Sequence, residues 1–260
     1  MRSLRCLTAS VHAGFASTAM HYAVGMTRRR WIADTWSDTT ATLKGEQAAH
    51  LARVLRAQPG QVFDVVANGF LHRAEIVTAR EDEVVFALYE ELEAEAALPV
   101  HLLMAIFKFD HLEWGIEKVT ELGVARITLV IARRTEKHLS LAAAKRVDRW
   151  RRIVREASQQ SRRSDVPMVD EPVALKQALE GVTAQTKLLL AETEQENLLS
   201  AALIGANDIA LAIGPEGGWA AEEMQLFAAN GWKSVTLGPR ILRAETAAIA
   251  ALAVCASQLS

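Results

Sequence analysis

The sequence predicts an α/β protein in which a small β-rich module precedes a larger domain built on a mainly parallel sheet. The chain has 260 residues, half of them apolar, which is enough for a hydrophobic core and argues against disorder or a fibre. Short strand-like runs fill the first part, whereas continuous apolar runs alternate with helical patterns after Pro99. Runs that are apolar on both faces are typical of strands buried between helices, as in parallel sheets.

Residues 1–25 are expected to be a non-structural extension, with Met26 as the natural start. They contain Arg2 and Arg5 and no acidic residue, but polar residues interrupt any apolar stretch that a signal peptide would need. An export signal is the less favoured alternative.

The module over residues 26–95 reads as short strands joined by turns. A strand is expected to open within 27–33, one short helix covers 46–56, and Pro59-Gly60 turns into a strand at 62–67. Asn68-Gly69 predicts a hairpin, because both central positions of a type I′ turn need positive φ. Further strands are expected at 74–77 and 83–89. The acidic stretch at 90–95 then marks the predicted domain boundary.

The domain over residues 96–260 alternates strands with helices. Strands are predicted at 101–107, 127–132, 187–191, 209–214 and 235–238, and helices at 110–122, 141–163, 220–230 and 244–259. The longest helix has Val147, Trp150, Val154 and Ala157 at spacings of three, four and three, which predicts a buried stripe. Its basic residues fall mostly off that stripe and therefore face solvent or a partner.

Charge is unevenly placed along the chain. The formal net charge of −2 becomes −4 without residues 1–25, yet residues 133–163 carry eleven basic side chains against three acidic ones. The overall balance would argue against a nucleic-acid partner, whereas clustered arginines suit phosphate because guanidinium binds it in a bidentate fork. For an isolated run of charge, a solvated helix face is the simpler interpretation.

Membrane, disulfide and metal functions have little support in the sequence. No uncharged apolar run reaches eighteen residues, and Cys6 and Cys255 have no spacing that indicates a disulfide framework or a zinc site. Cys255 is expected to be a small packed residue on an apolar helix. His50, His72 and His111 have no spaced partners and are more typical of surface or core positions. The expected compartment is a reducing cytoplasm.

Two glycine-containing turns follow predicted strands and precede predicted helices. The first is Ile213-Gly-Pro-Glu-Gly-Gly-Trp and the second is Leu237-Gly-Pro-Arg-Ile-Leu-Arg-Ala-Glu-Thr-Ala-Ala. Glycine lets the backbone approach a ligand closely, and α/β sheets bind ligands at the carboxyl ends of their strands. Neither turn has the dinucleotide fingerprint or a Walker lysine. A plain turn, and helix capping by Glu245 in the second, therefore stay open as alternatives.

Several motifs occur together in one order. They are Arg28-Arg-Arg, His50-Leu-Ala-Arg-Val-Leu-Arg with Pro59-Gly60, Lys118-Val-Thr-Glu-Leu-Gly-Val, Glu156-Ala-Ser-Gln-Gln-Ser with Arg163 and Val166-Pro167, the first glycine turn with Glu223, and the second glycine turn. Over nearly all of residues 26–260 this pattern resembles the ribosomal RNA small-subunit methyltransferase E family, which methylates N3 of a uracil in 16S rRNA. Independent motifs in the same order are more specific than any one of them.

The resemblance implies a PUA-like RNA-binding domain over 26–95 and a SPOUT methyltransferase domain over 96–260 whose C-terminal segment forms a trefoil knot. It also implies S-adenosylmethionine as cofactor, a homodimer that builds each site, and 16S rRNA or the 30S subunit as partner. The cofactor residues would be Leu190, Ala191, Glu192, Ile213, Gly214, Pro215, Gly217, Gly218, Leu237, Gly238, Ile241, Leu242, Thr246 and Ala247. No metal is required.

Methylation of uracil N3 needs a group that stabilises developing negative charge and a path for one proton. The candidate catalytic residues are Arg243, Arg163, Glu216 and Glu245. The candidate RNA-binding residues are Arg28, Arg29, Arg30, Arg53, Arg56, Lys118, Arg133 and Arg134.

Three positions depart from the family pattern. Ala244 stands where a threonine is usual, Trp219 where a phenylalanine or leucine is usual, and Phe109 where a glycine commonly follows a lysine such as Lys108. Two other functions remain as alternatives, namely another knotted RNA methyltransferase such as a ribose 2′-O enzyme, and an RNA-binding module without catalysis.

Overall fold

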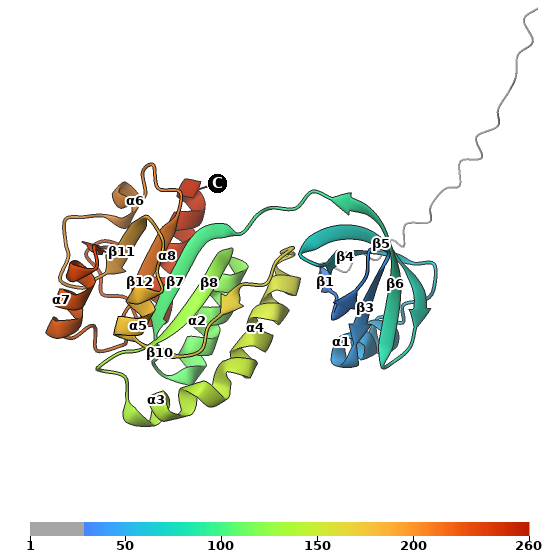
Figure 1. The fold of residues 1–260 in the computed structure, drawn as a ribbon, viewed down its shortest axis with the longest axis horizontal. Coiled ribbons are helices and arrows are strands. Elements are labelled where there is room, and N and C mark those ends of the chain that lie inside the picture. Colours follow the sequence, from blue (N-terminus) through green and yellow to red (C-terminus); the bar gives the residue numbers. More distant parts are fainter. Residues whose placement is uncertain (1–28, 260) are drawn as a thin grey trace, which may run out of the picture.

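The computed structural model describes residues 29–259, which form two sheets joined by one extended connection (Figure 1). The predictions for residues 1–25, Met26 and Arg28 fall outside this range. Sheet A ends at Leu92 and sheet B begins at Leu98, on either side of the predicted boundary at residue 95. The boundary itself stays a prediction.

Sheet A contains six strands in the order β1-β4-β5-β6-β3-β2. The strands are β1 (Trp31–Ile32), β2 (Thr35–Trp36), β3 (Thr40–Lys44), β4 (Val62–Ala67), β5 (Phe70–Ala79) and β6 (Glu83–Leu92). Asn68 and Gly69 have φ of 52° and 82°, which confirms the predicted hairpin turn between β4 and β5. The single helix predicted at 46–56 is instead α1 (Gly45–Ala49) followed by a π-helical turn, η1 (His50–Val54).

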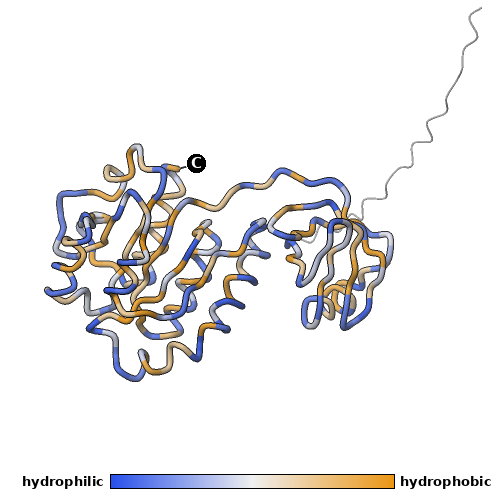
Figure 2. Tube along the Cα trace, viewed as in Figure 1, coloured by the Kyte–Doolittle hydropathy of each residue, from blue (hydrophilic) through white to orange (hydrophobic). Residues whose placement is uncertain are grey.

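A separate core holds sheet A together. Trp31, Leu43, Leu51 and Phe86 are fully buried in it, and the helical turn after β3 covers one side. Figure 2 shows this apolar interior as distinct from the interior of the larger part of the molecule. A core of its own is what an independent small domain needs.

Sheet B contains β7 (Leu98–Ala105), β8 (Val124–Ile131), β9 (Met168–Val169), β10 (Val173–Ala174), β11 (Thr186–Leu190), β12 (Ile209–Ile213) and β13 (Lys233–Val235). The order is β10-β8-β7-β12-β11-β13, with β9 also pairing β8, and every pair is parallel. The predicted mainly parallel sheet is therefore confirmed. Five of its strands, β7, β8, β11, β12 and β13, match the predicted apolar runs within a few residues, whereas the two-residue strands β9 and β10 are not predicted by the sequence.

Helices cover both faces of sheet B. They are α2 (Phe109–Glu121), α3 (Lys137–Ala143), α4 (Val147–Gln160), α5 (Leu175–Glu180), α6 (Leu199–Ala202), α7 (Ala221–Ala229) and α8 (Ala244–Leu259). Successive residues of β7 alternate, so that Leu102 and Met104 pack with α2 and α8, whereas Leu103 packs with α5 and α7. Both faces are apolar because both are covered.

Among the helices predicted after residue 96, the bounds agree within a residue except in the basic segment, and the short helices α5 and α6 are not predicted by the sequence. The predicted helix at 244–259 has the observed bounds of α8, but the helix predicted at 141–163 begins earlier as α3 and passes through a 3-10 turn, η2 (Ala144–Arg146), before α4. The buried stripe of Val147, Trp150, Val154 and Ala157 is confirmed. Cys255 is buried in α8 as a free cysteine. No helix within residues 29–259 is long and apolar enough to span a bilayer.

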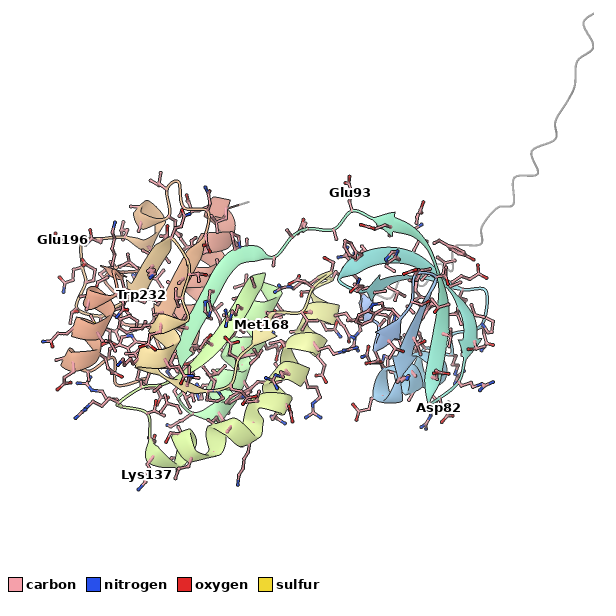
Figure 3. The ribbon with its side chains drawn as sticks, in the orientation of Figure 1. Asp82, Glu93, Lys137, Met168, Glu196 and Trp232 are labelled. Atoms are coloured by element: carbon pink, nitrogen blue, oxygen red, sulfur yellow. The ribbon has the colours of Figure 1, made fainter. Side chains whose placement is uncertain are left out.

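Helix α4 joins the two parts of the molecule. The Arg155 guanidinium donates hydrogen bonds to the carboxylate of Asp34 at 2.8 Å and to the carbonyl oxygen of Ile32 at 2.7 Å. The main-chain N–H of Arg30 donates to the carbonyl oxygen of Gln159 at 3.0 Å. The face of α4 opposite its buried stripe is therefore bonded to sheet A, and side chains from both lie along the seam between them (Figure 3).

Candidate functional site

Three predicted cofactor loops meet at one edge of sheet B. β11, β12 and β13 are neighbouring parallel strands, so the loops that follow Leu190, Ile213 and Val235 leave the sheet at the same carboxyl edge. The main-chain N–H of Thr236 donates to Asn197 at 2.8 Å, and that of Leu199 donates to the carbonyl oxygen of Thr236 at 2.9 Å. The end of loop 191–198 is therefore hydrogen-bonded to the first residue of loop 236–243.

Loop 214–220 has a defined shape that depends on its glycines. A Cβ on Gly214 would lie 3.0 Å from the indole nitrogen of Trp219, which is tighter than most real Cβ contacts, so the indole would have to shift by a few tenths of an ångström. Gly218 has a φ of +69°, and its N–H donates to the carbonyl oxygen of Pro215 at 2.8 Å. The motif is therefore a tight turn whose main chain is exposed at Gly217.

Glu223 connects this loop to the loop after β8. The side chain is buried, and one oxygen accepts a hydrogen bond from the N–H of Ala220 at 2.8 Å, ahead of α7. The other oxygen accepts from the N–H of Arg133 at 2.8 Å. Beside this bridge, the Arg134 guanidinium donates to the carbonyl oxygen of Gly217. The sequence pattern places Glu223 with the first glycine turn, and it predicts that Arg134 binds RNA.

Loop 236–243 leads into α8. Gly238 has a φ of +115°, and a Cβ there would meet no atom within 4 Å, so the main chain borders open space. The Thr236 hydroxyl bonds both the N–H and the carbonyl oxygen of Gly238, at 3.2 and 3.1 Å. Ile241 is 81% exposed and Arg243 is also exposed, at the start of α8.

The first turn of α8 meets α2 through a histidine–glutamate pair. Nδ1 of His111 lies 2.8 Å from Oε1 of Glu245, whose side chain is buried. The hydrogen bond to Glu245 raises the pKa of His111, while the nearby Arg243 charge opposes that rise. The other oxygen, Oε2 of Glu245, is buried and has no hydrogen-bond partner within residues 29–259. His111 is thus not the isolated residue that its sequence spacing indicates.

Arg163 lies at the other end of the sheet. Its guanidinium donates to the carbonyl oxygens of Thr120 at 2.6 Å and Val124 at 2.8 Å, and it pairs with Asp165. Val124 is the first residue of β8, so this site is at the amino edge of sheet B. The structure therefore does not bring Arg163 together with Arg243, and its contacts are those of a residue that stabilises the fold. Glu216 lies exposed on the glycine loop.

The predicted RNA-binding residues differ in what they contact. Arg29 bonds Gln159 and lies over the ring of Trp31, Arg30 donates to the carbonyl oxygen of Arg162, and Lys118 pairs with Glu117 and Glu121 at 2.7 Å. These three are part of the internal structure. Arg56 and Arg133 are exposed, and Arg53 is exposed with a long 3.8 Å approach to Glu81.

Acidic residues from elsewhere in the chain neutralise much of the basic segment 133–163. Glu113 accepts from Arg146 and Arg149 at 2.9 and 2.8 Å, and Arg151 pairs with Glu171 at 3.1 Å. With Asp34 on Arg155 and Asp165 on Arg163, four such acids reduce the segment's formal surplus of eight positive charges to four. Five of the eleven basic side chains, Arg146, Arg149, Arg151, Arg155 and Arg163, are thus paired with these acids.

A cavity of about 730 Å³ lies at the seam between sheet A and α4, away from the glycine loops. Its lining carries both signs of charge, with four cationic side chains and five acidic ones, namely Arg29, Lys44, Arg152 and Arg155 and Asp34, Glu46, Glu117, Glu121 and Glu156. Because those charges nearly balance, the cavity lacks the positive surface that a phosphate chain would need. The charged cavity at the seam and the glycine loops at the carboxyl edge of sheet B are therefore two separate regions of the protein.

Comparison with known proteins gives matches along most of the chain. Residues 43–88 match the RNA methyltransferase PUA domain family, and residues 94–256 match the RNA methyltransferase domain family. Ribosomal RNA small subunit methyltransferase E of Synechocystis is 37% identical over 83% of this chain and 72% of its own length. The protein of the same name from Bacillus subtilis is 32% identical over 84% of this chain and 90% of its own length.

Two solved structures are similar in both fold and sequence. A putative methyltransferase from Legionella pneumophila with bound cofactor SAM has a TM-score of 0.76 and 31% identity, over 88% of this chain and 96% of that chain. Ribosomal RNA small subunit methyltransferase E from Neisseria gonorrhoeae, bound to S-adenosyl methionine, has a TM-score of 0.74 and 29% identity, over 88% and 97%.

Proposed function

Because the chain belongs to the ribosomal RNA small subunit methyltransferase E family, we propose that it directs its S-adenosylmethionine-dependent methylation of rRNA to N3 of a uracil in 16S rRNA. The RNA methyltransferase activity and the cofactor follow from the family. The observation that supports the location of the site is the meeting of three loops at the carboxyl edge of sheet B, beside Arg243 and Glu245.

The residues at this edge fit an adenosyl cofactor. Gly238 borders open space and Gly217 exposes its main chain, so peptide groups are available to bond a base and a ribose. Leu190 and Ile213, the last residues of β11 and β12, add apolar side chains at the same edge. We propose that the cofactor contacts Leu190, Ala191, Glu192, Ile213, Gly214, Pro215, Gly217, Gly218, Leu237, Gly238, Ile241, Leu242, Thr246 and Ala247. When bound, the cofactor supplies an electrophilic methyl group on a sulfonium.

Arg243 is the proposed stabiliser of the transition state. As N3 of uracil loses its proton, negative charge moves onto the flanking carbonyl oxygens, and a fixed cation lowers the energy of that charge. Arg243 is exposed at the first turn of α8, close enough to His111 to influence its pKa. It is therefore available to a bound base, whereas the buried Arg163 is not.

The two candidate carboxylates have different proposed roles. Glu216 is exposed on the glycine loop, where it can orient the base through a hydrogen bond. Glu245 is buried and hydrogen-bonded to His111, so the proposed role of this pair is to relay the N3 proton away from the uracil. Together, Glu216 would contact the uracil ring and Glu245 would provide a route for the N3 proton.

RNA binding is proposed for the exposed cations. N3 takes part in Watson–Crick pairing, so the target uracil must be unpaired or turned out of its helix before it reacts. Arg53, Arg56 and Arg133 remain accessible to phosphates around it. The PUA domain supports an rRNA substrate, either free 16S rRNA or the 30S subunit.

A homodimer is proposed as the working form, in the cytoplasm. Trp114 on α2 is 48% exposed and Ile241 on the proposed cofactor loop is 81% exposed. These two side chains are the proposed apolar contacts of a surface that a second copy covers. Light scattering on the purified protein measures the oligomeric state, and a monomer at micromolar concentration would contradict this part of the proposal.

The uracil assignment is tested by supplying labelled cofactor with unmodified 30S subunits, free 16S rRNA or tRNA. We expect label in 16S rRNA or the subunit, and mass spectrometry of the nucleosides should identify 3-methyluridine. Label in ribose or in tRNA would contradict the assignment and indicate another knotted methyltransferase. Absence of both transfer and cofactor binding would instead indicate a simple RNA-binding module.

Replacing Arg243 tests the proposed mechanism. Arg243→Ala should lower kcat by about 10²–10³ fold, the usual effect of losing a group that stabilises transition-state charge. Cofactor affinity by calorimetry should stay within a few fold. Arg240→Ala removes the same charge from the same loop and serves as the matched control. If both variants turned over equally, the charge-stabilising role would belong to another residue.

A further inference from the structure

We propose that Arg134 is a positioning residue of the cofactor site, which fixes loop 214–220 in its binding shape and so sets the affinity for S-adenosylmethionine. The sequence assigned this arginine to RNA. The inference rests on the proposed assignment of the loop to the cofactor.

Arg134 lies along the glycines of the loop. Its Nη1 donates a hydrogen bond to the carbonyl oxygen of Gly217. A Cβ on Gly217 would lie 3.5 Å from Cδ of the arginine, and a Cβ on Gly218 would lie 3.8 Å from its Nη1. The stem and head of the arginine therefore pack over the two positions that carry no side chain. A Cβ at either position would only be in ordinary contact with the arginine, so it is the backbone turn at Gly218, with its φ of +69°, that favours glycine here.

The arginine extends from a firmly held turn. The Thr135 hydroxyl donates to the carbonyl oxygen of Ile106 at 3.0 Å and accepts from the N–H of Ala132 at 3.1 Å. The N–H of the preceding Arg133 is bound by Glu223. Because both flanking residues are fixed to other elements, the Arg134 side chain acts from a rigid base rather than from a free loop.

Loop 214–220 is thereby held at its middle and its end. Glu223 binds the N–H of Ala220, and Arg134 binds the carbonyl oxygen of Gly217. A loop that is already in its binding shape loses less conformational entropy when a ligand binds, so affinity rises without a direct contact. The bond is also charge-assisted, which makes it stronger than a neutral one. The affinity for the cofactor should therefore depend on Arg134.

Calorimetry of S-adenosylmethionine binding to the full chain without RNA tests the proposal. Arg134→Ala should weaken binding roughly tenfold, equivalent to one charge-assisted hydrogen bond, whereas Arg134→Lys, which keeps one donor, should recover part of the loss. Arg133→Ala is the matched control, because it removes the same charge one residue earlier and leaves the main-chain bond to Glu223 intact. Equal cofactor affinities for Arg134→Ala and Arg133→Ala would overturn the proposal.

Two further readouts separate positioning from other roles. Hydrogen exchange of the Gly218 amide, which bonds Pro215, should become faster in Arg134→Ala and stay unchanged in Arg133→Ala, with no ligand present. RNA binding in a filter assay should fall similarly in both variants, since both lose one positive charge. A loss of RNA affinity specific to Arg134→Ala, with normal cofactor affinity, would make it an RNA contact and refute the positioning role.

A glycine variant distinguishes failure of this inference from failure of the cofactor assignment. Gly214→Ala brings a Cβ to 3.0 Å from the Trp219 ring and should distort the loop. If the folded variant binds S-adenosylmethionine normally, the loop is not the cofactor site and both ideas fail. If it binds weakly while Arg134→Ala binds normally, only the role of Arg134 fails. Gly218→Ala, at a φ of +69°, repeats the test should Gly214→Ala not fold.

Discussion

Glu223 accepts hydrogen bonds from main-chain N–H groups in two different loops, the one after β8 and the one after β12. A buried carboxylate is costly unless such donors surround it. Glu223 meets that requirement with two peptide groups rather than with an arginine or lysine. The same side chain therefore satisfies its own charge and joins the loop of Arg134 to the proposed cofactor loop.

The pair of His111 and Glu245 should make part of the stability depend on pH. The hydrogen bond to Glu245 raises the pKa of His111 above 6.5, with Asp110 adding to the rise and Arg243 opposing it. A raised pKa means that the stabilisation is fully present below the unfolded-state pKa and is lost as pH rises through the folded-state pKa. The α2–α8 contact should thus weaken from neutral to mildly alkaline pH.

NMR titration of the His111 ring checks this expectation. The midpoint should lie above that of an ordinary histidine and should fall in Glu245→Gln, which removes the charge and keeps the shape. The pH dependence of unfolding by urea should flatten in His111→Gln. A midpoint that Glu245→Gln does not move would show that the pair has no such effect.

Long-range contacts explain why single residues were the least predictable part of the site. His111 finds its partner 134 residues away and Arg163 finds carbonyl oxygens about forty residues away. Sequence spacing carries no information on contacts at such separations. The glycine loops were found because their function depends on local chain shape, which a short motif does specify.

One face of helix α4 packs in the core and the other is bonded to sheet A, and the sequence predicts only the first of these contacts. Its apolar stripe gave the core-facing side correctly. The other side bears arginines that the sequence could equally assign to solvent, to RNA or to another domain. Only the structure shows Arg155 bonded to Asp34 and Ile32 across the seam.

Arg155 should therefore hold the PUA domain against α4. Arg155→Ala removes charge-assisted hydrogen bonds worth about 1–3 kcal/mol in total, so the two domains should separate part of the time. Small-angle scattering should then report a larger radius of gyration. Arg152→Ala, on the same cavity wall, is the control and should leave the radius unchanged. Unchanged scattering in both variants would mean that other contacts at the seam suffice.

Secondary structure was predictable where one pattern persisted over several turns or strands. α8 has the expected bounds because its apolar residues continue to the end of the described chain. The 46–56 helix was wrong in type, since a π-helical turn differs from an α-helix in hydrogen bonding rather than in composition. The start of α3 was missed because Lys137 and His138 interrupt the apolar pattern.

At the scale of the whole molecule, charge is organised by internal pairing. The arginines that are paired with carboxylates should contribute little to RNA binding, whereas cations without a carboxylate partner should release counterions when they meet phosphates. Lys145 is exposed, and Arg149 is held by Glu113.

The salt dependence of RNA affinity tests this division. Lys145→Gln should reduce the slope of log affinity against log salt by about 1, while Arg149→Gln should change it by much less. Filter binding in a series of potassium chloride concentrations gives both slopes. Equal reductions would mean that Arg149 leaves Glu113 to bind RNA.

Sheet order was beyond the sequence. Continuous apolar runs indicated parallel strands, but they did not indicate that β11 lies between β12 and β13, or that loop 191–198 brackets Thr236. The knot that the family resemblance implies stays a prediction. Strand order could not be predicted from the sequence because it depends on packing between segments that are far apart in the chain.

Trp219 closes the Gly214 turn and forms an edge-to-face series with Phe227 and Trp232, at ring separations of 4.9 and 5.2 Å. An indole in contact with the proposed cofactor loop is also a built-in optical probe, since its emission responds to changes in its immediate surroundings. Stopped-flow fluorescence on the unlabelled protein could thus follow the arrival and departure of a ligand in real time, without any attached dye.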